Sequence, residues 1–217
     1  MFQLSNWSIS RRLFALSGLA LVCLAAVGAL ALHGLSTAST HLNEVVKSGQ
    51  MLKNHAYANM LHDGIRGDVL SIIVTDEQAA RDELFQGLVD HTNELRNFVA
   101  GNQELVKEID ALASEKLGGS LGEVLPALEG YVTDARKIGE VAKNDPAKAR
   151  AELAAFERSF VSPEEPMEAF ADEILAYSAE AQSEADASLA SSRRDALLGG
   201  TVALALLFGF EIGRAHV

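Results

Sequence analysis

The sequence has few of the residue types from which disulfide frameworks, thiolate metal sites and nucleic-acid-binding surfaces are built. It contains one cysteine, Cys23, and its 18 basic residues are outnumbered by 30 acidic ones. A single cysteine excludes a disulfide framework and a thiolate metal site. The shortage of basic residues argues against nucleic acid or an anionic lipid surface as the main partner.

The chain also lacks the motifs of common enzyme sites. It has no glycine-rich phosphate loop, no nucleophile elbow, no paired metal-ligand motif and no cysteine–histidine pairing. His55 and His62 would lie about 10.5 Å apart along a helix axis, which is too far to share one ion. We therefore expect a protein that is not an enzyme and that carries no cofactor or metal.

Two apolar stretches bracket an acidic middle segment. Residues 13–32 form a run of about twenty residues without a charge, roughly 30 Å long as a helix, which matches the hydrocarbon thickness of a bilayer. A second uncharged run, at 196–210, is shorter, and the chain ends soon after it. We predict transmembrane helices at 13–35 and 196–217, the second of them truncated.

The arginine pair at 11–12 immediately precedes the first span. The positive-inside tendency therefore places the N-terminal tail, residues 1–12, in the cytoplasm and residues 36–195 outside the membrane. A second arginine pair, at 193–194, lies on the outer side against this tendency. A segment as long as 36–195 is translocated largely regardless of flanking charge, so we keep this orientation.

A cleaved export signal over residues 1–31 is the alternative to a first anchor. Ser10–Phe14 is similar to a twin-arginine signal, and Ala29–Ala31 offers a cleavage site. The apolar run is longer than the core of about 7 to 15 residues that is usual in such signals. A second hydrophobic segment at the other end of the chain also favours the uncleaved anchor.

Between the spans, almost every window favours helix. The segment is rich in Ala, Leu, Glu, Lys and Arg and has no alternating apolar pattern of strand length. A chain that leaves one membrane face and returns to it needs an even number of helices. We predict an all-α fold, an antiparallel up-down-up-down four-helix bundle over 36–195 flanked by two transmembrane helices, with the first and last helices continuing into the spans.

Helix breakers and caps suggest where the bundle turns. The candidate corners, in chain order, are the capping box Thr75–Gln78, the pair Gly101–Asn102, Ser120 with Glu123, Asp145 before Pro146, and Ser162–Glu165, where Ser caps the next helix. Equal helix lengths favour helices over 36–74, 76–117, 120–161 and 163–195. The alternative is a turn at Asp145, followed by a long last helix with a proline kink.

Four polar residues share one stripe of the first predicted helix: His55, Asn59, His62 and Arg66 lie within about 60° of one another at 100° per residue. Apolar residues flank the stripe, so the charge of Arg66 needs a carboxylate, a ligand or water. One hypothesis is an interhelical ion pair of Arg66, with both histidines as hydrogen-bonded register markers. The other is a ligand site in which these residues bind a small anion through a forked, charge-assisted contact to Arg66.

The segment His55–Leu70 resembles the sensory half of bacterial methyl-accepting chemotaxis proteins, most specifically in its His-Asp-x-x-Arg-x-Asp-Val core. The basic-flanked first span, Tyr131 and Asn144–Ala149 extend the resemblance, which covers residues 1–210. It implies a homodimeric four-helix bundle in the periplasm, anchored in the inner membrane, that senses a small molecule and passes a small helix displacement inward. It also favours the turn at Asp145.

Full-length relatives continue after the second span into a relay module and a long cytoplasmic hairpin, through which they reach the chemotaxis kinase and its adaptor. This sequence contains neither, so we expect an input fragment. Its tail, residues 211–217, looks like the translated start of a sequencing adapter, and we expect it not to be native. The alternatives are the input half of a sensor kinase or cyclic-nucleotide synthase, and an anchored helical protein without signalling output.

Overall fold

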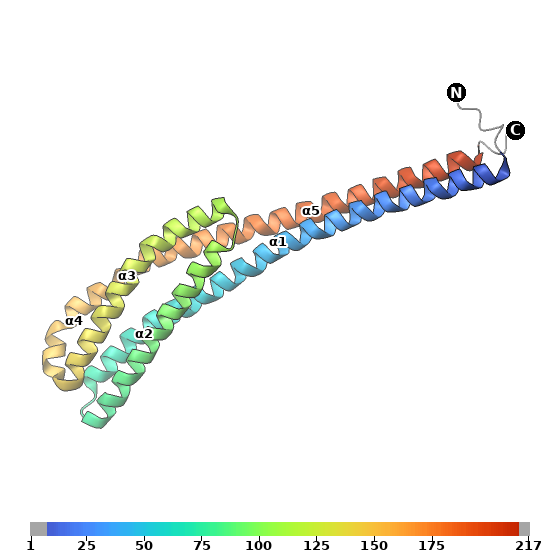
Figure 1. Cartoon of the computed structure of the whole chain (residues 1–217). Helices are drawn as coiled ribbons and strands as arrows, with labels where there is room; N and C mark the ends of the chain where they lie inside the picture. The colour runs from blue at the N-terminus through green and yellow to red at the C-terminus, as the bar shows by residue number, and fades with distance from the viewer. Residues whose placement is uncertain (1–7, 213–217) are drawn as a thin grey trace. The chain divides into compact units, whose positions relative to one another are not determined.

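The computed structural model describes residues 8–212, with side chains for all of these except 9, 12 and 207–212. The described chain is helical apart from short turns and contains no strand. Its helices are α1 (Ile9–Val74), α2 (Gln78–Lys107), α3 (Ala111–Asn144), α4 (Pro146–Val161) and α5 (Glu164–Ile212) (Figure 1). The prediction of an all-α fold is confirmed.

The two longest helices are the first and the last. α1 runs for 66 residues and α5 for 49 residues without a break. Residue contacts divide the chain into a terminal unit, residues 1–43 with 181–217, and a central unit, residues 44–180. Each long helix contributes residues to both units. The prediction that the first and last helices continue unbroken into the apolar segments is therefore confirmed.

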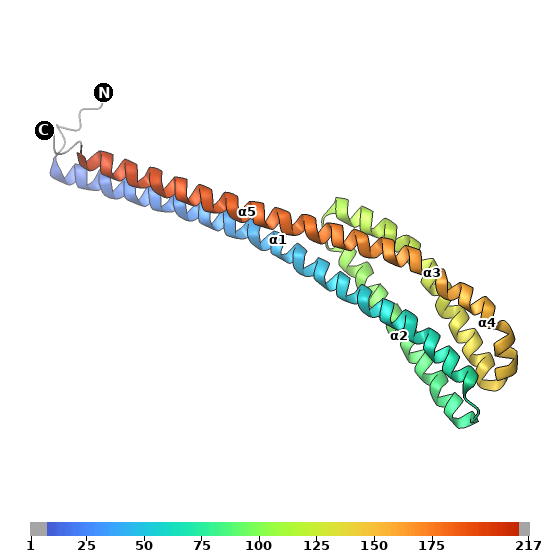
Figure 2. The same ribbon diagram turned by 180° about the vertical axis from the view of Figure 1, so that it is seen from behind.

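Within the central unit, α2 runs back along α1, α3 runs back along α2, and α4 runs back along α3 (Figure 2). Only Ser162 and Pro163 separate α4 from α5. Helical backbone hydrogen bonds flank this junction, from Ser162 N to Arg158 O at 3.2 Å and from Met167 N to Pro163 O at 2.9 Å. The junction is therefore a break in a helical run and not an open loop.

The turn predicted at Asp145 is confirmed. The Asp145 carboxylate accepts a hydrogen bond from Lys148 N at 3.0 Å, and Pro146 occupies the first turn of α4, where a missing N–H costs nothing. The break predicted at Ser162 is also present. Ser162 itself is the C-cap of α4 with helical backbone angles, so the prediction that it caps the following helix is wrong.

Two other predicted corners are wrong, because Gly101 lies inside α2 and Ser120 lies inside α3. The chain turns between them, at Asp110. Its carboxylate accepts hydrogen bonds from the amides of Leu112 and Ala113, each at 3.0 Å, which makes it the N-cap of α3. The equal-length partition predicted a third helix that runs to residue 161. This is wrong, because α3 ends at Asn144.

The chain does turn at the predicted capping box Thr75–Gln78, but the predicted capping hydrogen bonds are not formed. The Thr75 hydroxyl donates to Ser71 O at 2.7 Å and so closes the end of α1. The N-cap of α2 is Glu77, and it makes no side-chain cap hydrogen bond. The threonine oxygen satisfies a carbonyl of the preceding helix in place of an amide of the next one.

The core of the central unit draws side chains from all five helices. A β-carbon at Gly139 of α3 would overlap the end of the Leu88 side chain of α2, so these two helices pack closely there. α4 adds Ala149 and Phe156. The largest side chains that are almost fully enclosed are Met51, His62, Ile65, Val69, Ile72, Leu88, Leu95, Leu117, Tyr131, Val132, Phe170 and Ile174.

In the terminal unit, large apolar side chains are exposed: Leu24 is 71% exposed on α1, and Leu198 is 59% exposed on α5. Gly34 lies so close to α5 that a β-carbon there would be 2.5 Å from Ser192 Oγ. Small residues that let two helices approach closely are typical of helix pairs in membranes. Exposed apolar surface of this extent is typical of a site that contacts another protein or a membrane.

Among the described residues, one helix is long and apolar enough to cross a membrane by length and composition, and it is α1 from Leu13 onward. A signal sequence would have the same properties. The predicted second span, 196–210, extends beyond residue 206, the last with a described side chain before the C-terminus. Residues 1–7 of the predicted N-terminal tail lie outside the described residues, and the tail at 211–217 lies outside the described side chains.

The hydroxyl of Tyr131 offers a test of the central core, because it donates a buried hydrogen bond of 2.8 Å to the backbone oxygen of His62. Y131F removes this bond and keeps the ring, so we expect a loss of about 1 kcal/mol in the free energy of unfolding. The thermal midpoint should fall by about 2–4 °C, measured by circular dichroism of the full chain in detergent. The matched control is Y57F, whose ring is 41% exposed. Equal losses in the two variants would contradict a structural role for the Tyr131 hydroxyl.

Candidate functional site

The four residues of the predicted stripe have different environments on α1. His62 is buried, His55 and Arg66 are partly buried, and Asn59 is exposed. The stripe therefore does not face the core along its whole length, and of its four residues only His62 is buried. Only His62 and Arg66 share a neighbour, Phe160 of α4.

His62 is held by α3 and α4. Its ring stacks on Phe160 with centroids 4.4 Å apart and leans on Tyr131 at 4.7 Å. Its Nε2 lies 2.8 Å from the backbone oxygen of Phe160. A carbonyl oxygen only accepts hydrogen bonds, so Nε2 carries the proton of a neutral ring. The part of His62 that could donate to a ligand is therefore already engaged.

The position of the helix break explains why the Phe160 oxygen is open to this bond. The last four carbonyl groups of a helix have no partner within the helix, and α4 ends at Val161. The ring of His62, on another helix, satisfies one of them. Burial of the ring lowers the pKa of His62 below its ordinary value of 6.5, and the hydrogen bond to Phe160 opposes this only in part.

Arg66 forms an interhelical ion pair. Its Nε donates to both carboxylate oxygens of Glu157 on α4, at 2.9 and 3.1 Å, and its guanidinium group lies 5.0 Å from the centre of the Phe160 ring. The side chains of Arg66 and Glu157 are 41% and 33% exposed, so the pair sits at the rim of the core. The carboxylate that Arg66 was expected to need is therefore Glu157, so the ion-pair part of the first hypothesis is confirmed. Of the two histidines that it predicts to be hydrogen-bonded, only His62 has such a bond among the described residues.

The ion pair does not use the whole of Arg66. No described residue accepts a hydrogen bond from its two terminal nitrogens, which leaves donors at the surface for a second anion. The nearby Glu157 would repel that anion unless it moved away or was displaced. Anion binding at Arg66 thus stays a prediction. It requires that the anion replace Glu157 as the partner of Arg66.

The other two predicted residues lie apart from this pair. His55 meets the edge of Phe170 on α5 with ring centres 6.0 Å apart, and burial lowers its pKa. Asn59 is exposed and makes no hydrogen bond to another described side chain. The two histidines have different aromatic neighbours on different helices, so they do not converge on one position.

Sequence reasoning missed Glu157 as the partner of Arg66. A carboxylate between Phe156 and Phe160 on one helix was the available signal, because it places a charge at the edge of an apolar face. A second pair was also not predicted: Nδ1 of His91, whose side chain is 44% exposed, lies 2.6 Å from an oxygen of Asp68 on α1. Both pairs link α1 to a neighbouring helix.

Comparison with known proteins gives no relative. No family model matches the chain, and neither a curated protein nor a solved structure matches it. Any function must therefore be argued from the residues and geometry described above.

The buried ring of His62 predicts a pH effect on stability. Its pKa is lowered in the folded chain by burial, opposed by the Phe160 bond and by the charges of Asp63 and Glu164. The unfolded chain therefore takes up a proton first, and stability that is complete above about pH 6.5 is lost as the pH falls below it. His55 acts in the same direction.

We expect the thermal midpoint of the full chain to fall between about pH 7.5 and pH 5, and to fall less in H62Q. The glutamine amide can still donate to Phe160 O but does not titrate in this range. H91Q, at a surface histidine whose side chain is 44% exposed, is the matched control and should keep most of the wild-type dependence. An unchanged pH dependence in H62Q would show that His62 is not the titrating group.

Proposed function

We propose that the chain is the input module of a bacterial transmembrane chemoreceptor of the methyl-accepting type. The observation that carries this proposal is the continuity of α1 and α5. Each is a single helix that joins an exposed apolar segment to the packed central unit. A helix without a loop has nothing to absorb a small displacement along its axis, and this suits a receptor better than an enzyme.

In this proposal the central unit is a four-helix bundle whose fourth member is made of α4 and the first part of α5. Cross-helix contacts support the assignment. Asp68 of α1 pairs with His91 of α2, and Arg66 of α1 pairs with Glu157 of α4. On the other side, Nζ of Lys116 on α3 lies 2.6 Å from a carboxylate oxygen of Glu173 on α5. Pairs of this kind are what neighbouring helices of the proposed bundle would form.

The proposed mechanism begins at the link between α1 and α4. A small anion that binds the terminal nitrogens of Arg66 weakens the hold of Arg66 on Glu157. The stack of Phe160 on His62 and the junction at Ser162–Pro163 connect this change to α5. Helix shifts of about 1–2 Å at subunit interfaces are known from allosteric proteins. α5 would then slide against α1 and carry the signal inward.

We further propose that residues 13–35 and 196–217 anchor the chain in the inner membrane, with the central unit in the periplasm and the tail of residues 1–12 in the cytoplasm. The exposed leucines of the terminal unit and the arginine pair at 11–12 support this topology. A homodimer is the expected assembly. The chemotaxis kinase and adaptor would be reached only through a cytoplasmic region beyond the second span.

The same continuity of α1 and α5 supports a second candidate, the input half of a membrane sensor kinase or cyclic-nucleotide synthase. An anchored helical protein without signalling output is the third. Sequencing the gene across and beyond the codon for Phe210 distinguishes these candidates. A relay module followed by a long heptad hairpin supports the chemoreceptor, and a catalytic domain there excludes it.

Calorimetric titration of the full chain in nanodiscs with a panel of small organic acids tests the ligand site. R66A should weaken binding of any acid that the wild type binds by about ten- to a hundredfold, because a hydrogen bond to a charged group contributes about 1.5–3 kcal/mol. R96A is the matched control, since Arg96 also forms an interhelical pair, with Glu129. Binding that persists in R66A and is lost in R96A would move the anion site away from Arg66.

Protease treatment of spheroplasts tests the topology. Trypsin added outside should cut the Lys- and Arg-containing segment 36–195 without lysis, because the central unit faces the periplasm in this proposal. Intact cells, whose outer membrane excludes the protease, are the control. Protection of 36–195 until the spheroplasts are lysed would refute an external central unit.

A further inference from the structure

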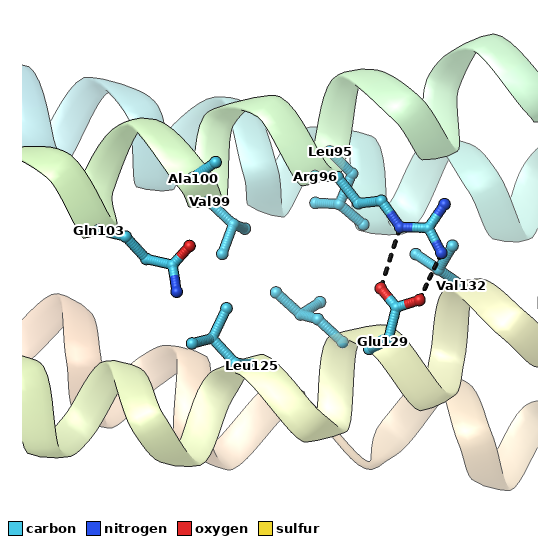
Figure 3. Close-up of a pocket in the computed structure, with 9 residues that line it drawn as sticks. Leu95, Arg96, Val99, Ala100, Gln103, Leu125, Glu129 and Val132 are labelled. Carbon is cyan, nitrogen blue, oxygen red and sulfur yellow. Dashed lines mark hydrogen bonds and ion pairs between the residues drawn. The ribbon is translucent and has the colours of Figure 1, made fainter.

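A groove lies between α2 and α3, on a part of the central unit that the Arg66 site does not use. It has a volume of about 250 Å³. Its apolar walls face one another across the two helices, with Val99 and Ala100 on α2 and Leu125 on α3 (Figure 3). Leu95, Leu128 and Val132, which are at most 4% exposed, place it directly over the core.

The groove offers no unpaired charge. At one end, Arg96 and Glu129 face each other as a forked pair, with Nε to Oε2 at 2.9 Å and Nη2 to Oε1 at 2.5 Å (Figure 3). At the other end is the amide of Gln103, which makes no hydrogen bond to a described residue. A charged ligand would lose water here without gaining an opposite charge, whereas a neutral hydroxyl or N–H would gain a partner at Gln103.

The core behind the groove is incompletely packed. A second space of about 10 Å³ lies on the inner side of Val99 and Leu128, which line both spaces. Asn102 also lines this space; it is 2% exposed, and its Oδ1 has no hydrogen-bond partner among the described residues. Buried polar atoms without hydrogen-bond partners are rare in folded proteins, and each one therefore needs a specific explanation.

The α3 side of the groove is also a weak part of its helix. Pro126 lies inside α3, next to the groove residue Leu125. A proline removes one backbone hydrogen bond and disfavours straight helix. The wall can therefore adjust at lower cost than an ordinary helix.

We propose that this groove binds a small neutral aromatic molecule that carries one hydroxyl or N–H group. The size follows from volume, because a cavity of about 150 Å³ lined by apolar side chains accepts benzene, so the larger groove accepts two fused rings. The rings lie between Val99 and Leu125, and the polar group donates to the Gln103 side-chain oxygen. The inference goes beyond the proposed function, since binding here requires neither Arg66 nor a signal across the membrane.

The test uses the full chain in lipid nanodiscs, with 2-naphthol as the probe and empty nanodiscs to subtract its partition into lipid. Fluorescence titration at neutral pH should show saturable binding, and amide exchange should slow at 95–103 and 125–132. A100F fills the groove from an exposed position and should weaken binding at least tenfold. A79F, the same change at an exposed alanine of α2 away from the groove, should leave binding unchanged.

Two further arms decide the chemistry. 2-Naphthoate, which has the same rings and a negative charge, should bind at least tenfold more weakly than 2-naphthol, and R66A should bind 2-naphthol like the wild type. Unchanged binding in A100F, exchange protection elsewhere in the chain, or tighter binding of 2-naphthoate would each overturn the proposal. So would concentration-dependent protection of the groove without probe, because a second copy of the chain would then be its occupant.

Discussion

The packing of His62 against α3 and α4 is the interaction on which the central unit depends. One residue supplies two separate groups: its ring satisfies the open carbonyl of Phe160, and its own backbone oxygen receives the Tyr131 hydroxyl. Three helices therefore meet at one position of α1. The Arg66–Glu157 pair lies one turn further along and closes the same interface at the rim. Buried polar groups are tolerated here because each has a partner in a different helix.

Each of the two long helices has a different apolar pattern in the central unit and in the terminal unit, although its backbone is continuous. In the central unit α1 buries an apolar face with Met51, Ile65 and Ile72, while in the terminal unit it exposes large apolar side chains such as Leu21 and Leu24. An amphipathic pattern is typical of a bundle in water, and an all-round apolar pattern is typical of a helix in lipid. α1 stays helical through this change of pattern, so its backbone conformation does not mark where one environment ends.

The helical class and the unbroken first and last helices could be predicted from composition and hydrophobic pattern. Local caps made Asp145 one of several candidate turns, and only the resemblance to a known family favoured it. The turn at Asp110 could not, because Gly101 and Ser120 have similar local chemistry and packing decides between such positions. The need of Arg66 for a carboxylate followed from burial alone. Its partner lies 91 residues away, and the partner of His62 is a backbone carbonyl made available by a helix end, which side-chain patterns do not reveal. The groove between α2 and α3 depends on side-chain shapes and was not predictable.

The continuity of α1 also limits how such a gene can change. A loop accepts one inserted residue with little effect, but each residue added inside a helix turns everything beyond it by about 100°. An insertion in α1 between its apolar segment and His62 would thus rotate one set of contacts away from its partners. Length variation is tolerable there only in steps of about seven residues, close to two full turns. Related genes should therefore vary in their short connections and keep the phase of this helix.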